Sequence, residues 1–175
     1  QPEPQPIEED ETLKPFSVLL LGIDQRIHDK GRSDTIIYSV IRPEDHRVLL
    51  ISIPRDSFVE IVGRNTHDKI NHAYAFGGAK MSVETVERLL DAPVEHYAAI
   101  NFQGLVQLID YLGGLHLELE HDLINRDPAH EKLEVRAGKE LYSGEEVLGF
   151  LRYREIGGDI GRTQRHQQFL YALLE

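Results

Sequence analysis

Short apolar runs and amphipathic stretches alternate along most of this chain, and the pattern predicts strands that alternate with helices. Residues 16–23 form a continuous apolar run, typical of a strand buried on both faces. Shorter apolar or β-branched runs predict further strands at residues 35–41, 48–53, 97–100 and 115–119. Strands alternating with helices favour an α/β fold with a largely buried central sheet.

The helices are predicted from apolar spacings of three and four residues and from polar residues that can cap them. Residues 66–77 are compatible with a helix that ends at two glycines. Four more helices are predicted after capping positions: after Ser82, after Asn101 and up to Gly113-Gly114, after the capping box of Ser143 and Glu146, and after Asp159. Residues 120–136 are polar and rich in turn formers, which predicts a surface excursion.

The composition limits the classes of protein. The chain has 175 residues, long enough for one domain with a core, and its net charge of −11 argues against non-specific nucleic-acid binding. It has no cysteine, which excludes disulfides and thiolate metal sites. Residues 1–15 are rich in proline and acid, which predicts an extended linker, either a tail without function or a spacer to a further segment. No P-loop, dinucleotide-binding or hydrolase-elbow motif occurs.

Arginine changes this picture, because thirteen arginines outnumber six lysines and gather at predicted element ends. Arg26 and Arg32 lie between Asp24 and Asp34, and Arg55 follows the third strand. A further group lies in the C-terminal region: Arg152, Arg154, Arg162 and Arg165. Guanidinium groups hold two phosphate oxygens at once, and helix N-termini add backbone donors. Such clusters predict a site for phosphate or pyrophosphate.

Two carboxylates suggest a metal at the same site. Asp24 ends the first predicted strand and Asp34 lies where the second begins, so both stand at one edge of the sheet if those strands are neighbours. Mg²⁺ takes one or two carboxylates and completes its shell with phosphate oxygens and water. Each Asp–Arg pair alone is more often a plain salt bridge. The coincidence of all clusters with strand or helix ends favours a metal-assisted site for a phosphate ester.

The same residues carry a family resemblance. Six motifs occur in order: LLLGIDQR, GRSDTIIYSV, LLISIPRDSFVEI, DKINHAYAFGG, FQGLVQLIDYLGGL, and FLRYR followed by GDIGRTQRHQQ. From residue 16 to the C-terminus the chain resembles the LytR-CpsA-Psr (LCP) family. The resemblance implies a single three-layer α/β/α domain with a central mixed sheet over residues 16–175. It also implies an extracytoplasmic location on a bacterial cell membrane, with an N-terminal anchor.

The resemblance further implies a phosphotransferase that moves a glycopolymer from a polyprenyl-pyrophosphate carrier to a cell-wall acceptor such as peptidoglycan. Asp24 and Asp34 match the family's metal ligands, for Mg²⁺ or Mn²⁺. The pyrophosphate-binding candidates are Arg32, Arg55, Arg152, Arg154, Arg162 and Arg165. Asp34 and Arg55 are the catalytic candidates, although Asp34 is either a base or only a metal ligand. The candidates for an apolar lipid tunnel are Phe102, Leu105 and Val106.

Three alternatives remain open at this point. A hydrolase acting on the same lipid would use the same site and release the polymer to water. A lipid-binding scaffold would bind without turnover. A transcriptional regulator is disfavoured by the acidic charge and the absence of a DNA-binding motif. Lys69 and Asn71 match a family motif, but the sequence does not decide whether they touch ligand or brace the loop.

Overall fold

The computed structural model describes residues 14–24, 31–125, 132–153 and 160–174. The chain forms two compact units, which are described separately: residues 1–21 with 32–99, and residues 22–31 with 100–175. The expected mixed α/β class with a central mixed sheet is confirmed. The predicted linker lies mostly outside the described residues. Among the described residues, no helix has the length and apolar character needed to cross a membrane.

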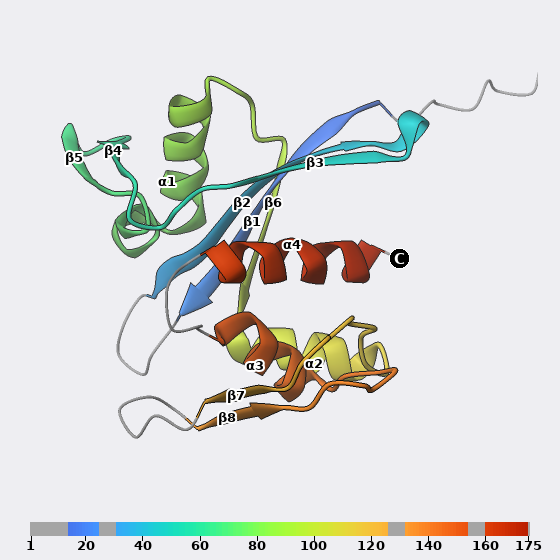
Figure 1. The fold of residues 1–175 in the computed structure, drawn as a ribbon. Coiled ribbons are helices and arrows are strands. Elements are labelled where there is room, and N and C mark those ends of the chain that lie inside the picture. Colours follow the sequence, from blue (N-terminus) through green and yellow to red (C-terminus); the bar gives the residue numbers. More distant parts are fainter. Residues whose placement is uncertain (1–13, 25–30, 126–131, 154–159, 175) are drawn as a thin grey trace, which may run out of the picture. The chain divides into compact units, whose positions relative to one another are not determined.

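The central sheet belongs mainly to the first unit (Figure 1). Its strands lie in the order β3-β2-β1-β6. They are β1 (Phe16–Asp24), β2 (Arg32–Arg42), β3 (Arg47–Ser52) and β6 (His96–Asn101). A short 3-10 turn, η1 (Pro43–Asp45), joins β2 to β3, which pair antiparallel. Alternate residues of β1 are buried and the residues between them are partly buried, so the expected full burial on both faces was wrong.

A hairpin and a helix complete the first unit. Strands β4 (Phe58–Ile61) and β5 (Thr66–Lys69) pair antiparallel, and α1 (His72–Leu90) follows. The predicted helix over residues 66–77 was therefore wrong in its first turn, because residues 66–69 pair with β4. Gly77 and Gly78 interrupt α1 instead of ending it, with Gly78 at φ +66°. Ser82 is not a cap, because its hydroxyl donates to the Gly78 carbonyl within the helix at 3.1 Å.

The described residues of the second unit form three helices and a hairpin. They are α2 (Phe102–Tyr111), α3 (Gly144–Arg152), α4 (Ile160–Leu174) and strands β7 (Leu123–Asn125) and β8 (Leu133–Val135). The predicted surface excursion over residues 120–136 contains this antiparallel hairpin. The predicted strand over residues 115–119 was wrong: Leu115 forms only an isolated bridge with Tyr142. Leu115 and Leu117 are still buried and Leu119 is partly buried, so their alternation reflects burial without strand pairing.

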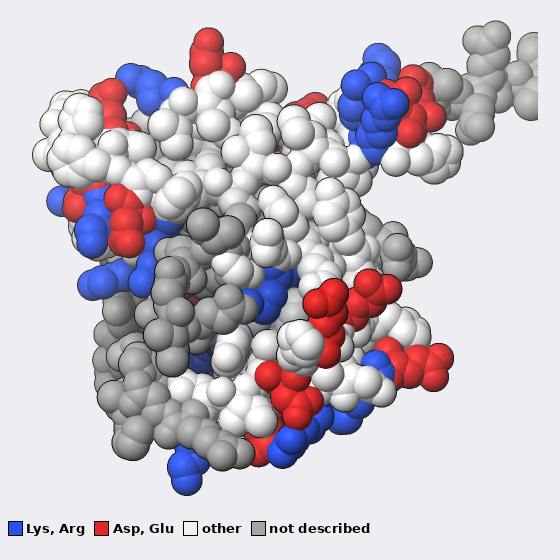
Figure 2. Space-filling view, in the orientation of Figure 1, with Lys and Arg blue, Asp and Glu red and all other residues white. Residues whose placement is uncertain are grey.

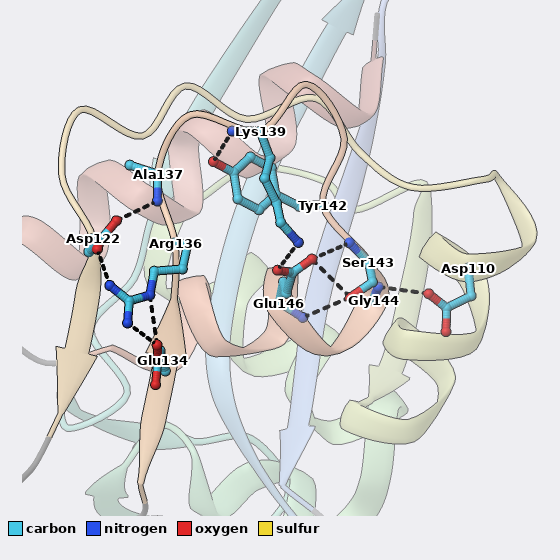
Figure 3. A network of polar contacts seen from close by, with 10 residues as sticks. All are labelled: Asp110, Asp122, Glu134, Arg136, Ala137, Lys139, Tyr142, Ser143, Gly144 and Glu146. Carbon is cyan, nitrogen blue, oxygen red and sulfur yellow. Dashed lines mark hydrogen bonds and ion pairs between the residues drawn. The ribbon is translucent and has the colours of Figure 1, made fainter.

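Caps fix the start of α2 and α3, as predicted. The Asn101 side chain accepts from the Gly104 amide at 2.8 Å, and Ser143 with Glu146 forms the capping box. Asp110 of α2 also accepts from the Gly144 amide at 2.8 Å (Figure 3). A Cβ atom at Gly144 would overlap the Val106 backbone, with its Cα at 2.7 Å. Glycine at this position therefore lets α3 begin directly against α2. The predicted Asp159 cap lies outside the described residues.

The stability that this cap contributes depends on pH through the ionisation of Glu146. Lys139 donates to its carboxylate, and Ser143 adds further hydrogen bonds, which together lower the pKa of Glu146 below its usual 4.5. A carboxyl with a lowered folded-state pKa stabilises the fold above its unfolded pKa, and this contribution is lost as the pH falls through the folded value.

We expect Glu146→Gln to lower the free energy of unfolding by about 0.5 kcal/mol at pH 7, because it removes the ion pair with Lys139 while glutamine can still complete the capping box. The difference from the wild type should fade at pH values below the usual carboxyl pKa of 4.5. Urea unfolding across a pH series measures it, with the neighbouring Glu145→Gln as the matched control. A difference that stays constant down to pH about 3 would contradict the role of Glu146 ionisation.

Candidate functional site

An arginine–aspartate pair lies at one end of the β2–β3 pairing. The Ile53 amide donates to the Ile36 carbonyl at 2.9 Å, which continues the pairing beyond the last residue of β3. Two residues later, Arg55 Nη1 donates to Asp34 Oδ1 at 2.8 Å. The two side chains are 30% and 28% exposed, so both are partly open to solvent. The sequence analysis placed both residues at ends of predicted strands, but it did not predict the hydrogen bond between their side chains.

The loop that carries Arg55 is fixed by the segment before α1. The Asn71 amide donates to the Arg55 carbonyl at 3.2 Å, and the Ile70 amide donates to the Ser57 carbonyl at 2.8 Å. Lys69 Nζ lies 3.4 Å from Asp56 Oδ1. These contacts brace the loop, which is one of the two roles left open for the Lys69–Asn71 motif. Asn71 is 5% exposed, and its Oδ1 has no hydrogen-bond partner among the described residues.

The second unit holds two more of the candidate arginines, in different environments. Arg152 is exposed at the last position of α3, with its guanidinium carbon 5.2 Å from the centre of the Phe102 ring. Helix α3 includes Arg152, and the extended backbone begins at Tyr153. Arg165 of α4 is only 7% exposed, and its Nη2 donates to the Tyr153 carbonyl at 2.7 Å. This contact ties α4 to the end of α3.

The lipid-tunnel candidates lie in the apolar core of the second unit. Leu105 is a buried member of that core, and Phe102 and Val106 are partly buried against it. Arg152 lies over the ring of Phe102, so an exposed cation borders this apolar region. A core position and a tunnel position are both compatible with this burial, and the tunnel stays a prediction.

Other site candidates stay predictions as well. Arg154 and the side chain of Arg162 lie outside the described residues. Arg32 begins β2 and is exposed, and Asp24 ends β1. Within the described ranges, no group of three or more histidine, cysteine or acidic residues could hold a metal ion. A site made of two aspartates would not form such a group, so the expected magnesium site is neither supported nor contradicted.

Sequence reasoning missed the β4–β5 hairpin beside Arg55. Its signal was present: FVEI and THDK are separated by VGRN, and Gly63 and Asn65 can adopt the positive φ that such a turn needs. The polar residues of THDK obscured the second strand, because no residue of β5 is buried and the segment shows no apolar alternation.

The fold and these charged pairs define a mixed α/β protein with arginine and aspartate gathered beyond paired strands. The chain belongs to the LytR_cpsA_psr family, whose sequence pattern matches residues 2–175. The polyisoprenyl-teichoic acid–peptidoglycan teichoic acid transferase TagU of Halalkalibacterium halodurans is 43% identical over 164 residues, covering 92% of this chain and 53% of that protein. The chain thus spans about half the length of the curated relatives it matches.

Solved structures agree with this assignment. Bacillus subtilis TagV superimposes with a TM-score of 0.79 at 36% identity, over 92% of this chain and 64% of that one. TagT with bound octaprenyl pyrophosphate lipid gives a TM-score of 0.77 at 32% identity, over 97% of this chain and 68% of that one. The predicted family is therefore confirmed.

The two described arginines of the second unit should respond differently to substitution. We expect Arg165→Ala to lower the free energy of unfolding by about 2–3 kcal/mol, because it removes a buried charged donor and leaves a carbonyl unsatisfied. Arg152→Ala should cost less than about 1 kcal/mol, as exposed cation–π contacts do. Urea unfolding of both variants tests this, and equal losses would contradict a structural role for Arg165.

Proposed function

We infer that this chain is the catalytic part of a transferase that moves a glycopolymer from a polyprenyl-pyrophosphate carrier to a cell-wall acceptor such as peptidoglycan. The observation that carries the proposal is the Asp34–Arg55 pair, near the start of β2 and just beyond the end of β3, in a chain similar to TagU and to lipid-bound TagT. Location on the extracytoplasmic side of the membrane, through an N-terminal anchor, belongs to the same proposal.

The arginine side chains supply the positive charge that the pyrophosphate requires. Arg55 is held at both ends, through its backbone carbonyl by Asn71 and through its guanidinium by Asp34. A guanidinium positioned in this way needs little reorganisation to bind an anion, which is the condition for strong electrostatic catalysis. Arg152, Arg154 and Arg162, with Arg32 as a further candidate, would complete the binding of the charged head group.

Arg165 has a different part in the proposal. Its guanidinium is largely buried and bonds the Tyr153 carbonyl, so it is better suited to position the end of α3 than to bind the anion. The residues that follow Tyr153 include Arg154. Arg165 would therefore support the pyrophosphate site indirectly, as a positioning residue.

The reaction would join the acceptor to the phosphorus that bears the sugar. The acceptor hydroxyl oxygen forms a bond to that phosphorus, the bond to the bridging oxygen breaks, and prenyl phosphate leaves. The hydroxyl proton passes to a base, for which Asp34 is the candidate. Arg55 fixes the position of the Asp34 carboxylate through Oδ1, and either role of Asp34, as base or as metal ligand, would use the other oxygen.

Magnesium or manganese fits the donor chemistry of this region. Two aspartates, Asp24 and Asp34, match the one or two carboxylates that Mg²⁺ takes beside phosphate oxygens. Asp34 remains 28% exposed although it is paired with Arg55. A bound ion would neutralise charge on the pyrophosphate.

A hydrolase remains the second candidate, because water in place of the acceptor hydroxyl would give prenyl phosphate and a free phosphorylated polymer. The names of the relatives favour transfer, since each names a teichoic acid transferase. An assay with and without a defined glycan acceptor separates these activities.

Arg55→Ala should reduce transfer about 100-fold, the usual loss when one donor to a developing negative charge is removed. Release of prenyl phosphate from a polyprenyl-pyrophosphate glycan, with acceptor present, measures it. Arg42→Ala is the matched control, because Arg42 pairs with Asp45 at 2.6 Å beside the turn that joins β2 to β3. Activity near the wild-type level in Arg55→Ala would remove Arg55 from the site.

The metal proposal predicts coupled binding. Mg²⁺ should bind weakly to the protein alone and at least about tenfold more tightly with inorganic pyrophosphate, because two carboxylates leave most of its shell to water. Asp24→Asn and Asp34→Asn should each reduce this coupling, whereas Asp45→Asn should not. Titration calorimetry decides the point: equal Mg²⁺ affinity with and without pyrophosphate would argue against a shared site.

A further inference from the structure

The β4–β5 hairpin has one buried face and one exposed face. Its antiparallel register sets Phe58 opposite Lys69 and Glu60 opposite His67, so these four side chains share a face. The intervening residues of β4 are buried. Packing against the core therefore does not determine which side chains occupy the exposed face.

Phe58 is the main apolar group on that face. It is 73% exposed, and its ring centre lies 5.8 Å from that of His67, with the two planes inclined by 33°. The diagonal pairing across the two strands holds the rings in place on a hydrogen-bonded scaffold. The two exposed rings lie side by side and form an aromatic platform, although neither ring is part of the core.

Charged groups of both signs border the platform. Lys69 pairs with Asp56 at 3.4 Å, with the side chains 54% and 60% exposed. Glu60, two residues from Phe58, pairs with Arg88 at 3.2 Å, again with both side chains open to solvent. The platform is thus flanked by exposed donors and acceptors that an incoming ligand could use.

This combination matches the chemistry of a saccharide. A pyranose ring has a face of C–H groups that packs on the electron-rich face of an aromatic ring, and hydroxyl groups at its edge that bond charged side chains. An anionic lipid surface fits less well, since it selects clusters of basic residues. Here Arg64, Lys69 and Arg88 are balanced by Asp56, Glu60 and Asp68. Figure 2 likewise shows both charge signs around the uncharged surface over β4 and β5.

The platform is also close to Arg55 along the chain. Phe58 is three residues beyond Arg55, so their Cα atoms are at most ~11 Å apart. Backbone bonds from Ile70 to Ser57 and from Asn71 to Arg55 hold the connecting loop. A sugar ring on Phe58 would therefore lie near the proposed reaction centre in the same unit.

We propose that Phe58 and His67, with Asp56, Glu60 and Lys69, form a subsite for the acceptor glycan, in which one pyranose ring stacks on Phe58. This subsite rests on the proposed transferase function. It positions the saccharide whose hydroxyl attacks the phosphorus, and it does not take part in binding the carrier lipid.

A soluble oligosaccharide of N-acetylglucosamine is the probe for this subsite. We expect it to bind the wild-type protein, with Phe58→Ala weakening the binding about tenfold, the loss expected for one stacking contact. Phe58→Trp should retain binding, and Phe58→Leu should not, because leucine is apolar but has no ring face. Tyr111→Ala is the matched control, an aromatic residue 89% exposed on α2. Equal affinities in Phe58→Ala and the wild type, or no binding by the wild type, would overturn the subsite.

The transfer assay separates this proposal from the proposed function. With a polyprenyl-pyrophosphate glycan donor, Phe58→Ala should raise KM for the acceptor about tenfold and leave KM for the donor unchanged. Wild-type transfer with an unchanged acceptor KM in Phe58→Ala would overturn the subsite and leave the transferase standing. Saccharide binding that depends on Phe58, without transfer by the wild type, would overturn the transferase function and leave a saccharide-binding site at Phe58. Phe58-dependent binding to lipid vesicles without saccharide binding would identify a membrane contact and overturn the subsite.

Discussion

The antiparallel register of β2 with β3 is the constraint on which the candidate site depends. Ile37 lies opposite Ser52, and the next bond joins Ile53 to Ile36, so the chain leaves the pair at a fixed point beside Asp34. Side chains in strands alternate between two faces, and a slip of one residue would reverse the faces of the β3 side chains and shift the turn that carries Arg55 relative to Asp34. The buried side chains of β2 resist such a slip, because it would expose them. Core packing in the sheet therefore determines where a partly exposed ion pair forms.

Much of the fold was predictable from the sequence because its signals were local. The caps at Asn101 and Ser143 and the end of α2 at Gly113-Gly114 depend on residues within one turn of each other. The errors occurred where a distant partner decided the structure. Residues 66–69 became a strand because β4 lies beside them, and residues 115–119 stayed unpaired except at Leu115. Apolar spacing does not contain that information.

The candidate site shows the same contrast between features set by local sequence and features set by distant partners. Strand ends located Asp24, Asp34 and Arg55 as predicted, because the order of residues along the chain alone determines which side chains lie next to the end of a strand. The partners of those residues were not predictable. Arg152 and Arg165 look equivalent in the sequence, yet one is exposed over Phe102 and the other is buried against the Tyr153 carbonyl. Which arginine reaches solvent depends on how α4 packs against α3.

The excess of arginine is therefore a weaker signal of phosphate binding than its placement. Arg42, Arg88 and Arg136 each pair with acidic neighbours on the surface, and Arg64 lies over Phe76. Such local pairs engage these arginines without any ligand. The net charge of −11 consequently need not repel a pyrophosphate, since exposed charges beyond about 8 Å are largely screened at physiological salt. What an anionic ligand experiences is the local set of groups around Arg55, and there the strand register and the braced loop keep one guanidinium in a constant position.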